Sequence, residues 1–198
     1  MTSVTAPSLP VCMLDNEKQP FTAFLQTATN FVEFGAGGST VYAASFITGS
    51  ITSLDSSRDW LNVVAVACAE HPEWVQPQLV FADIGPVKEW GQPRDESCRE
   101  HWPSYATKMW DLPDTDQADL YLIDGRFRVS CFIETLMRCR ADAVLLIHDF
   151  AERQEYHVIR KFAREIAVSS SLSAFVRRAD FDRKDAMHLL EAARYSTN

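Results

Sequence analysis

Short apolar runs alternate along the chain with longer segments whose apolar residues repeat at helical spacing. Runs of about four to eight residues rich in Val, Ile, Leu and Phe are typical of buried strands. Such runs occur at residues 31–34, 50–54, 79–83, 119–124, 143–148, 174–178 and 187–191. The alternation of these strands with helices predicts a single α/β domain with a doubly wound, mostly parallel sheet of seven strands.

The segments between the strands predict amphipathic helices. Apolar residues share one helical face in three of them: Trp60, Val63, Val64 and Ala67, then Val129, Phe132, Ile133 and Leu136, then Tyr156, Ile159, Phe162 and Ile166. Each face is expected to cover the sheet. Two further helices are expected at residues 22–29 and 39–46.

Residues 84–117 interrupt this alternation, because no apolar period is sustained there. The stretch carries four prolines and four large aromatic residues: Pro86, Pro93, Pro103, Pro113, Trp90, Trp102, Tyr105 and Trp110. Long connections of this kind are usually functional lids or binding loops, and packing over a sheet edge is the alternative. We interpret the stretch as an insertion within one domain that spans residues 1–198.

The net charge and the cysteine pattern indicate which partners the protein does not bind and in which compartment it works. A net charge of −8 argues against nucleic acid as a partner, because binding to a phosphate backbone requires clustered Lys and Arg. The five cysteines form no C-x-x-C pair, which argues against a disulfide framework or a zinc finger. No run approaches the roughly 20 apolar residues of a membrane span, and no signal peptide is recognisable. We therefore expect a cytoplasmic protein without a membrane partner.

A glycine-rich turn, Gly35-Ala36-Gly37-Gly38, follows the first predicted strand. Glycine allows the backbone to approach a ligand closely, because a Cβ would block the approach or forbid the required φ. A helix that begins directly after the turn offers unpaired N–H donors. The turn is therefore the first candidate for a ligand-binding loop.

An acidic residue, Asp55, ends the second predicted strand about 20 residues after the turn, and Ser56 follows it. Its carboxylate can accept hydrogen bonds from both hydroxyls of a ribose. The third glycine of the dinucleotide pattern is missing because Thr40 stands there, and the chain has no G-x-x-x-x-G-K-[ST] motif. The expected ligand contains adenosine but no pyrophosphate.

Taken in order, these segments resemble the motifs of class I S-adenosylmethionine-dependent methyltransferases. The matching segments are Val32-Glu33-Phe34-Gly35-Ala36-Gly37-Gly38, Ser53-Leu54-Asp55, Phe81-Ala82-Asp83-Ile84-Gly85-Pro86, Leu122-Ile123-Asp124-Gly125-Arg126 and Leu146-Ile147-His148-Asp149. The ordered set is more specific than any single motif. The resemblance implies a Rossmann-like sheet with strand order 3-2-1-4-5-7-6 and an antiparallel last strand.

The resemblance also implies S-adenosylmethionine as the cofactor and a role for each matched position. The methionine end would be held by Glu33 and by the glycine turn, Gly35, Ala36, Gly37 and Gly38. The ribose would be held by Asp55 with Ser56, and the adenine would be flanked by Asp83 and Ile84. Asp124 would lie beside the methionine ammonium or the reacting centre.

Asp124, His148 and Asp149 end neighbouring strands and are the candidates for catalysis. His148 is either a general base that deprotonates the acceptor or a histidine whose ring is satisfied by the backbone. The three could also converge on a hard cation such as Mg²⁺, as in the metal-dependent O-methyltransferases that this region partly resembles. Those enzymes commonly carry Asp-Asn or a richer acidic set where this chain has His148-Asp149. We therefore assign no metal site.

Arg126 and Arg128 follow Asp124 across a glycine, and two interpretations stay open. They recognise an anionic acceptor, or they pair with acidic neighbours such as Asp149 and Glu134.

The predicted activity is methyl transfer from S-adenosylmethionine to an oxygen or nitrogen of a small-molecule acceptor. A non-catalytic, methyltransferase-like module that binds a nucleoside is the first alternative, because fold does not establish function. An NAD-dependent oxidoreductase is the second, and the missing glycine disfavours it. The apolar residues of the insertion are also compatible with a homodimer.

Overall fold

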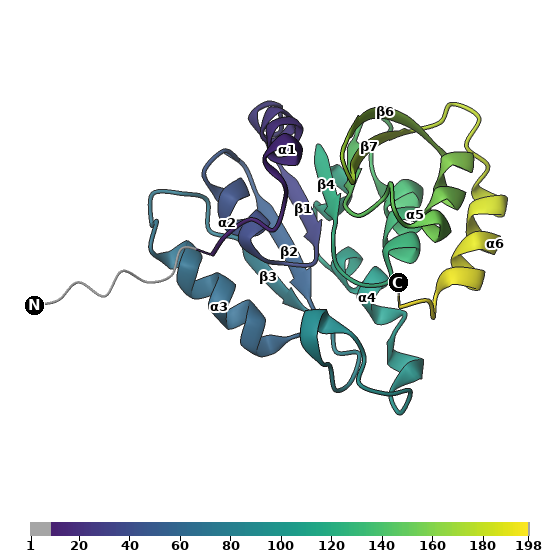
Figure 1. The fold of residues 1–198 in the computed structure, drawn as a ribbon, viewed down its shortest axis with the longest axis horizontal. Helices are drawn as coiled ribbons and strands as arrows, with labels where there is room; N and C mark the ends of the chain where they lie inside the picture. Colours follow the sequence, from purple (N-terminus) through teal and green to yellow (C-terminus); the bar gives the residue numbers. More distant parts are fainter. Residues whose placement is uncertain (1–8, 198) are drawn as a thin grey trace, which may run out of the picture.

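The computed structural model describes residues 9–197, which form a seven-stranded sheet flanked by helices (Figure 1). The strands are β1 (Phe31–Phe34), β2 (Ile51–Asp55), β3 (Gln78–Phe81), β4 (Leu120–Ile123), β5 (Val144–Ile147), β6 (Ala163–Ser169) and β7 (Leu172–Arg177). Their order is β3-β2-β1-β4-β5-β7-β6. Only β7 runs against the others, since it is antiparallel to both β5 and β6. The predicted fold class and strand order are confirmed.

Helices cover both faces of the sheet. They are α1 (Asp15–Thr27), α2 (Gly38–Ala44), α3 (Arg58–Ala69), α4 (Ser104–Thr107), α5 (Arg128–Arg138) and α6 (Arg183–Ala193). One core contains α5, α6 and part of the segment between β3 and β4, whereas α1 and α2 pack with the opposite face. The central strands β1 and β4 are buried at every position because both faces are covered.

Two predicted elements near the C-terminus are wrong. The helical spacing that starts at Tyr156 continues only through a 3₁₀ helix, η5 (Gln154–Lys161), and residues 163–169 form β6 instead. The exposed edge strand alternates buried and exposed positions, so that Ile166 points outward. Residues 187–191, predicted as the last strand, lie within α6, whose start is capped by Asp182. The apolar residues of this segment suggested a strand, although Asp182 is a typical residue for the start of a helix.

Three other helices differ in detail from the prediction. α1 begins at Asp15, well before the predicted start at residue 22, and α2 ends at Ala44. α3 is present, but Trp60 and Val63 are partly exposed while Leu61 and Val64 are buried. The apolar face of α3 is therefore rotated from the predicted one, whereas the α5 face is buried as expected.

The long connection between β3 and β4 forms short helical turns around one buried cluster. These turns are η1 (Glu89–Gly91), η2 (Arg99–His101), α4, η3 (Lys108–Asp111) and η4 (Thr115–Gln117). Trp102, Tyr105 and Met109 are buried in the core that also contains α5. Trp90, in contrast, is 80% exposed and has a φ of 61°, which L residues rarely adopt. The connection thus has a packed base and an exposed turn.

Among residues 9–197, no helix combines the length and apolar character that crossing a lipid bilayer requires.

Candidate functional site

The three glycines of the turn after β1 differ in what a side chain at their positions would meet. Gly35 has a φ of +102°, and a Cβ on it would lie 2.5 Å from the backbone nitrogen of Gly125. A Cβ on Gly38 would lie 2.1 Å from the carbonyl oxygen of Pro10. A Cβ on Gly37 would meet nothing closer than the Trp60 ring at 3.8 Å. Gly35 and Gly38 therefore serve internal packing, whereas Gly37 leaves the turn open to a ligand.

Glu33, in β1, fixes the glycine turn through hydrogen bonds. Its carboxylate is fully buried and accepts hydrogen bonds from the hydroxyls of Ser39, Thr40 and Ser53, the last at 2.9 Å. The hydroxyl oxygen of Thr40 in turn accepts a hydrogen bond from the Gly37 amide at 2.9 Å. Burial raises the pKa of Glu33 to about 7, although the three hydroxyls act in the opposite direction. Both oxygens of Glu33 are engaged within the chain, so its influence on a ligand is exerted through the turn.

Asp55 and Ser56 lie where β2 ends, beside the glycine turn. One Asp55 oxygen accepts a hydrogen bond from the Ser57 amide at 2.8 Å. Burial raises the pKa of Asp55 to about 6, against the lowering effect of the Ser57 and Ser56 amides. Ser56 is buried and lies under the exposed turn at Gly91, whose carbonyl oxygen is 3.4 Å from its hydroxyl.

The two residues expected to flank an adenine differ in burial. Asp83 is exposed and accepts a hydrogen bond from the Gly85 amide at 3.1 Å, whereas Ile84 is buried. Both follow β3, so they lie at the same edge of the sheet as Asp55.

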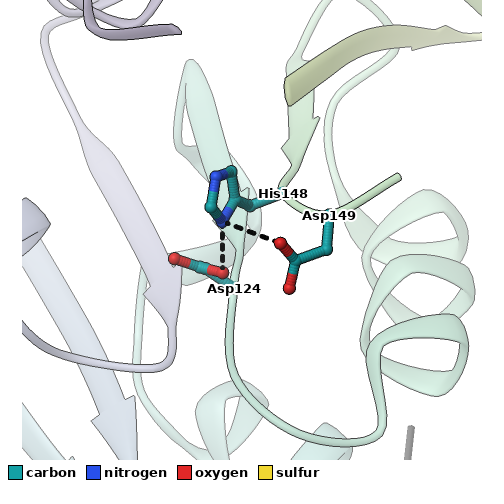
Figure 2. Close-up of side chains that lie close together, drawn as sticks. All are labelled: Asp124, His148 and Asp149. Atoms are coloured by element: carbon teal, nitrogen blue, oxygen red, sulfur yellow. Dashed lines mark hydrogen bonds and ion pairs between the residues drawn. The ribbon is translucent and has the colours of Figure 1, made fainter. Parts of the chain in front are cut away.

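The structure brings Asp124, His148 and Asp149 together at the ends of β4 and β5 (Figure 2). Nδ1 of His148 lies 3.1 Å from an Asp124 oxygen and 3.7 Å from an Asp149 oxygen. Burial disfavours the charged imidazolium, but Asp124, and then Asp149 and Glu17, outweigh it and raise the pKa of His148 to about 9. His148 is thus protonated at neutral pH, and it is held by carboxylates rather than by the backbone.

Glu17 is a member of this cluster that the sequence analysis missed. This buried residue of α1 places one carboxylate oxygen 3.3 Å from Nε2 of His148. Its other oxygen accepts hydrogen bonds from the amide and the hydroxyl of Ser171, in the turn between β6 and β7. Glu17 lies 131 residues from His148 in sequence, so no local motif connects the two.

The guanidinium of Arg128 bridges two carboxylates of a candidate metal-binding group. The ligand atoms of Asp124, His148 and Asp149 lie within 4.8 Å of one another, which is compatible with a cation. However, the buried Arg128 guanidinium lies 3.1 Å from Asp124 and 3.1 Å from Asp149. It also donates to the carbonyl oxygens of Gly125, His148 and Asp124. Since an internal cation already neutralises both carboxylates, this donor set does not fit a divalent metal.

A cavity of about 780 Å³ opens in front of these residues. Its walls include Asp124, His148 and Asp149 together with Lys88, Trp90 and Gln92 of the exposed turn, Cys12, and Arg126 and Arg153. The turn at residues 88–92 therefore lines both this cavity and the region over Ser56. A volume of this size accommodates a small molecule.

Solved structures show which known proteins the chain is similar to. A methyltransferase-like protein, spo2022 from Silicibacter pomeroyi, matches with a TM-score of 0.87 and 27% identity, over 95% of this chain and 98% of that chain. An O-methyltransferase from Bacillus cereus, in complex with SAH, matches with a TM-score of 0.51 and 14% identity, over 86% and 84% of the two chains. Precorrin 8w decarboxylase from Methanobacterium thermoautotrophicum matches with a TM-score of 0.54 and 13% identity, over 87% and 94%.

Scans against protein-family models and against the curated proteins found no match. The fold and the solved structures nevertheless agree with the resemblance seen in the sequence. The chain therefore has the Rossmann-like fold of class I S-adenosylmethionine-dependent methyltransferases.

Proposed function

We propose that the chain transfers the methyl group of S-adenosylmethionine to an oxygen or nitrogen of a small-molecule acceptor. The observation that carries this proposal is the alignment of three features along one edge of the sheet. These are the open turn at Gly37 after β1, Asp55 after β2, and the cavity with Asp124 and His148 after β4 and β5. Ligands of open α/β sheets bind at the carboxyl ends of the strands.

Each candidate residue has a part in this proposal that its surroundings allow. The backbone at Gly37 permits close approach, and the Asp55 oxygen that does not bind Ser57 accepts from the ribose hydroxyls. The Ile84 side chain is buried in the core, so the adenine would lie against the backbone after β3. Asp124 lies between the glycine turn and the cavity, because Gly125 packs against Gly35. It therefore faces the methionine end.

When bound, S-adenosylmethionine supplies an electrophilic methyl group on a sulfonium, and the chain must align the acceptor and remove its proton. Alignment of the acceptor with the methyl group can contribute much of the rate. Nδ1 of His148 and a carboxylate oxygen of Asp124 share a hydrogen bond of 3.1 Å. We assign proton removal to this pair once His148 has lost its own proton, and the negative charge of Asp124 then stabilises the imidazolium that forms.

The proposal is tested by calorimetric titration with S-adenosylmethionine and with its demethylated product, SAH. The unsubstituted chain is expected to bind SAH in the micromolar range, and Asp55→Ala to bind it at least about tenfold more weakly, because hydrogen bonds to a charged group are lost. Gly37→Val is expected to block binding by filling the open turn. Asp59→Ala, which alters an exposed carboxylate in α3, is the matched control.

The pH dependence of the same titration gives a second check. Affinity is expected to hold above pH 6 and to fall as the pH is lowered through 6, because the raised pKa of Asp55 means that it becomes protonated there. Absence of SAH binding by the folded, unsubstituted chain would contradict the proposed function.

A further inference from the structure

The cavity contains more basic than acidic side chains, although the chain as a whole has a net charge of −8. The basic residues in its walls are Lys88, Arg126, Arg128, Arg153 and His148, whose pKa is raised to about 9, and the acidic ones are Glu89, Asp124 and Asp149. Clefts lined by one sign of charge attract ligands of the opposite sign. The distribution of these charges therefore bears on the chemistry of the acceptor.

Arg128 contributes little to the excess of positive charge in the cavity walls. It is bound to both Asp124 and Asp149, and its guanidinium lies over the Tyr156 ring, 5.8 Å from the ring centroid. Its positive charge is thus compensated within the chain, as one of the two interpretations of the arginine pair expects.

Arg126 is different, because it has no carboxylate partner among residues 9–197. Its side chain is 9% exposed and lines the cavity. Nε and one terminal nitrogen both donate to the backbone carbonyl oxygen of Thr197, at 3.0 and 2.7 Å. Burial and the nearby charge of Arg128 lower the pKa of Arg126. Two N–H groups of an arginine side chain match the spacing of two oxygens of an anion. In Arg126 both of these groups donate instead to one uncharged carbonyl oxygen.

Two further cations lie in the same walls. Arg153 is 3.6 Å from Asp149, a distance too long for a direct hydrogen bond, and its guanidinium also lies over Tyr156. Lys88 is exposed on the turn at residues 88–92 and forms no ion pair with the part of the chain that the structure describes. Both can reach a group that enters the cavity from solvent.

We propose that the methyl acceptor carries an oxyanion, a carboxylate or a phosphate, which Arg126 binds through two N–H···O hydrogen bonds in place of the Thr197 carbonyl. Lys88 and Arg153 add positive charge on the open side of the cavity. The oxyanion anchors the acceptor, while the oxygen or nitrogen to be methylated lies toward Asp124 and His148. This inference rests on the proposed function, because it assigns the same cavity to the acceptor.

The test is calorimetric titration of the full chain with sodium malonate and, separately, with inorganic phosphate, each with and without saturating SAH. Arg126→Gln removes both the positive charge and the paired N–H donors of the guanidinium. Arg126→Lys keeps the charge but removes the paired donors. Arg164→Gln, at an exposed position of β6 far from the cavity lining, is the matched control. Thermal unfolding of every variant shows whether it is folded.

The unsubstituted chain is expected to bind one of the two anions. Its affinity should fall at least about tenfold in Arg126→Gln, by a smaller factor in Arg126→Lys, and not at all in Arg164→Gln. Binding of malonate alone identifies a carboxylate acceptor, and binding of phosphate alone identifies a phosphorylated one. Equal affinity in Arg126→Gln, or no anion binding by the unsubstituted chain, would overturn the inference and leave Arg126 as an anchor for Thr197.

The SAH titration separates this inference from the proposed function. SAH binding without anion binding overturns only the acceptor class. Anion binding without SAH binding overturns the methyltransferase proposal and leaves an anion site at Arg126.

Discussion

Glu33 and Asp55 lie near the ends of neighbouring strands, but they differ in what their oxygens can still bind. Glu33 uses both oxygens to hold Ser39, Thr40 and Ser53, which fixes the shape of the glycine turn. Asp55 has one oxygen on the Ser57 amide. Burial raises the pKa of both carboxyls, to about 7 and about 6. A ligand hydroxyl that reaches Asp55 would reduce the cost of its buried charge, whereas Glu33 is already satisfied.

The proposed role of His148 predicts a specific pH profile. Because the pKa of His148 is raised to about 9, kcat/KM is expected to increase with pH up to about 9 and then to level off. His148→Gln is expected to lose this limb and to lower kcat/KM about 100-fold or more. The measurement is the methylation rate from pH 6 to pH 10, with His188→Gln as control because His188 is exposed on α6. The same limb in His148→Gln would show that another group takes the proton.

At the scale of elements, Glu17 joins three parts of the fold that are far apart in sequence. It accepts from the Leu14 amide at the start of α1, from Ser171 between β6 and β7, and it faces His148 at the end of β5. Burial opposes ionisation, but the hydrogen bonds from Ser171, Leu14 and His148 lower the pKa of Glu17 to about 2. Its stabilising effect is therefore complete above the ordinary value of 4.5 and is lost as the pH falls toward 2.

Glu17→Ala is expected to lower the free energy of unfolding by about 2 to 4 kcal/mol at pH 7, because it leaves buried donors without an acceptor. Urea denaturation measures this change. Asp15→Ala, at an almost fully exposed side chain of the same helix, is expected to have little effect and serves as the control. The difference between the chain and Glu17→Ala should shrink below pH 4.5. A pH-independent difference would mean that α1 packing, rather than the charge, is responsible.

The sequence predicts the first five strands because each is a short apolar run between segments of helical spacing. Their order follows from the resemblance to class I methyltransferases, and the structure has the same order. Asp55, Asp124 and His148 could be placed at one edge for the same reason. Residues 174–178 also predict a strand, and they coincide with most of β7. β6 could not be placed, since Ile166 fits helical spacing as well as strand alternation and lies on an exposed edge. In α6, the apolar residues Met187, Leu189 and Leu190 are as compatible with a short strand as with a helix, and only the cap at Asp182 distinguishes the two.

The contacts of Arg126, Arg128 and Glu17 could not be predicted from the sequence, because they depend on residues far apart along the chain. Arg126 and Arg128 are two positions apart, yet one binds carboxylates and the other binds the carbonyl oxygen of Thr197. That division depends on where α5 begins and on contacts across 71 residues. Periodicity contains no information on such contacts, so the charge of the cavity could only be read from the structure.

At the scale of the whole molecule, segments close to each end of the described chain complete a site built by the middle of the sheet. Cys12 lines the cavity from the segment before α1, and Pro10 packs against Gly38 in the glycine turn. Thr197 lies on Arg126 after the last helix. The strands β2, β1, β4 and β5 are parallel neighbours, so their carboxyl ends lie at one edge of the sheet. The site is therefore assembled from the full length of the described chain.

The position of β7 between β5 and β6 determines the order in which these strands can pair during folding. During synthesis β6 leaves the ribosome first, but it has no strand to pair with until β7 follows. We expect β6 and β7 to form a hairpin through their local turn and to dock onto β5 as one unit. Pulse-labelling hydrogen exchange during refolding should show their amides becoming protected together, after those of β1 and β4. Until then, the apolar edge of β5 is open to other chains, and Leu145 and Ile147 are where misassembly would begin.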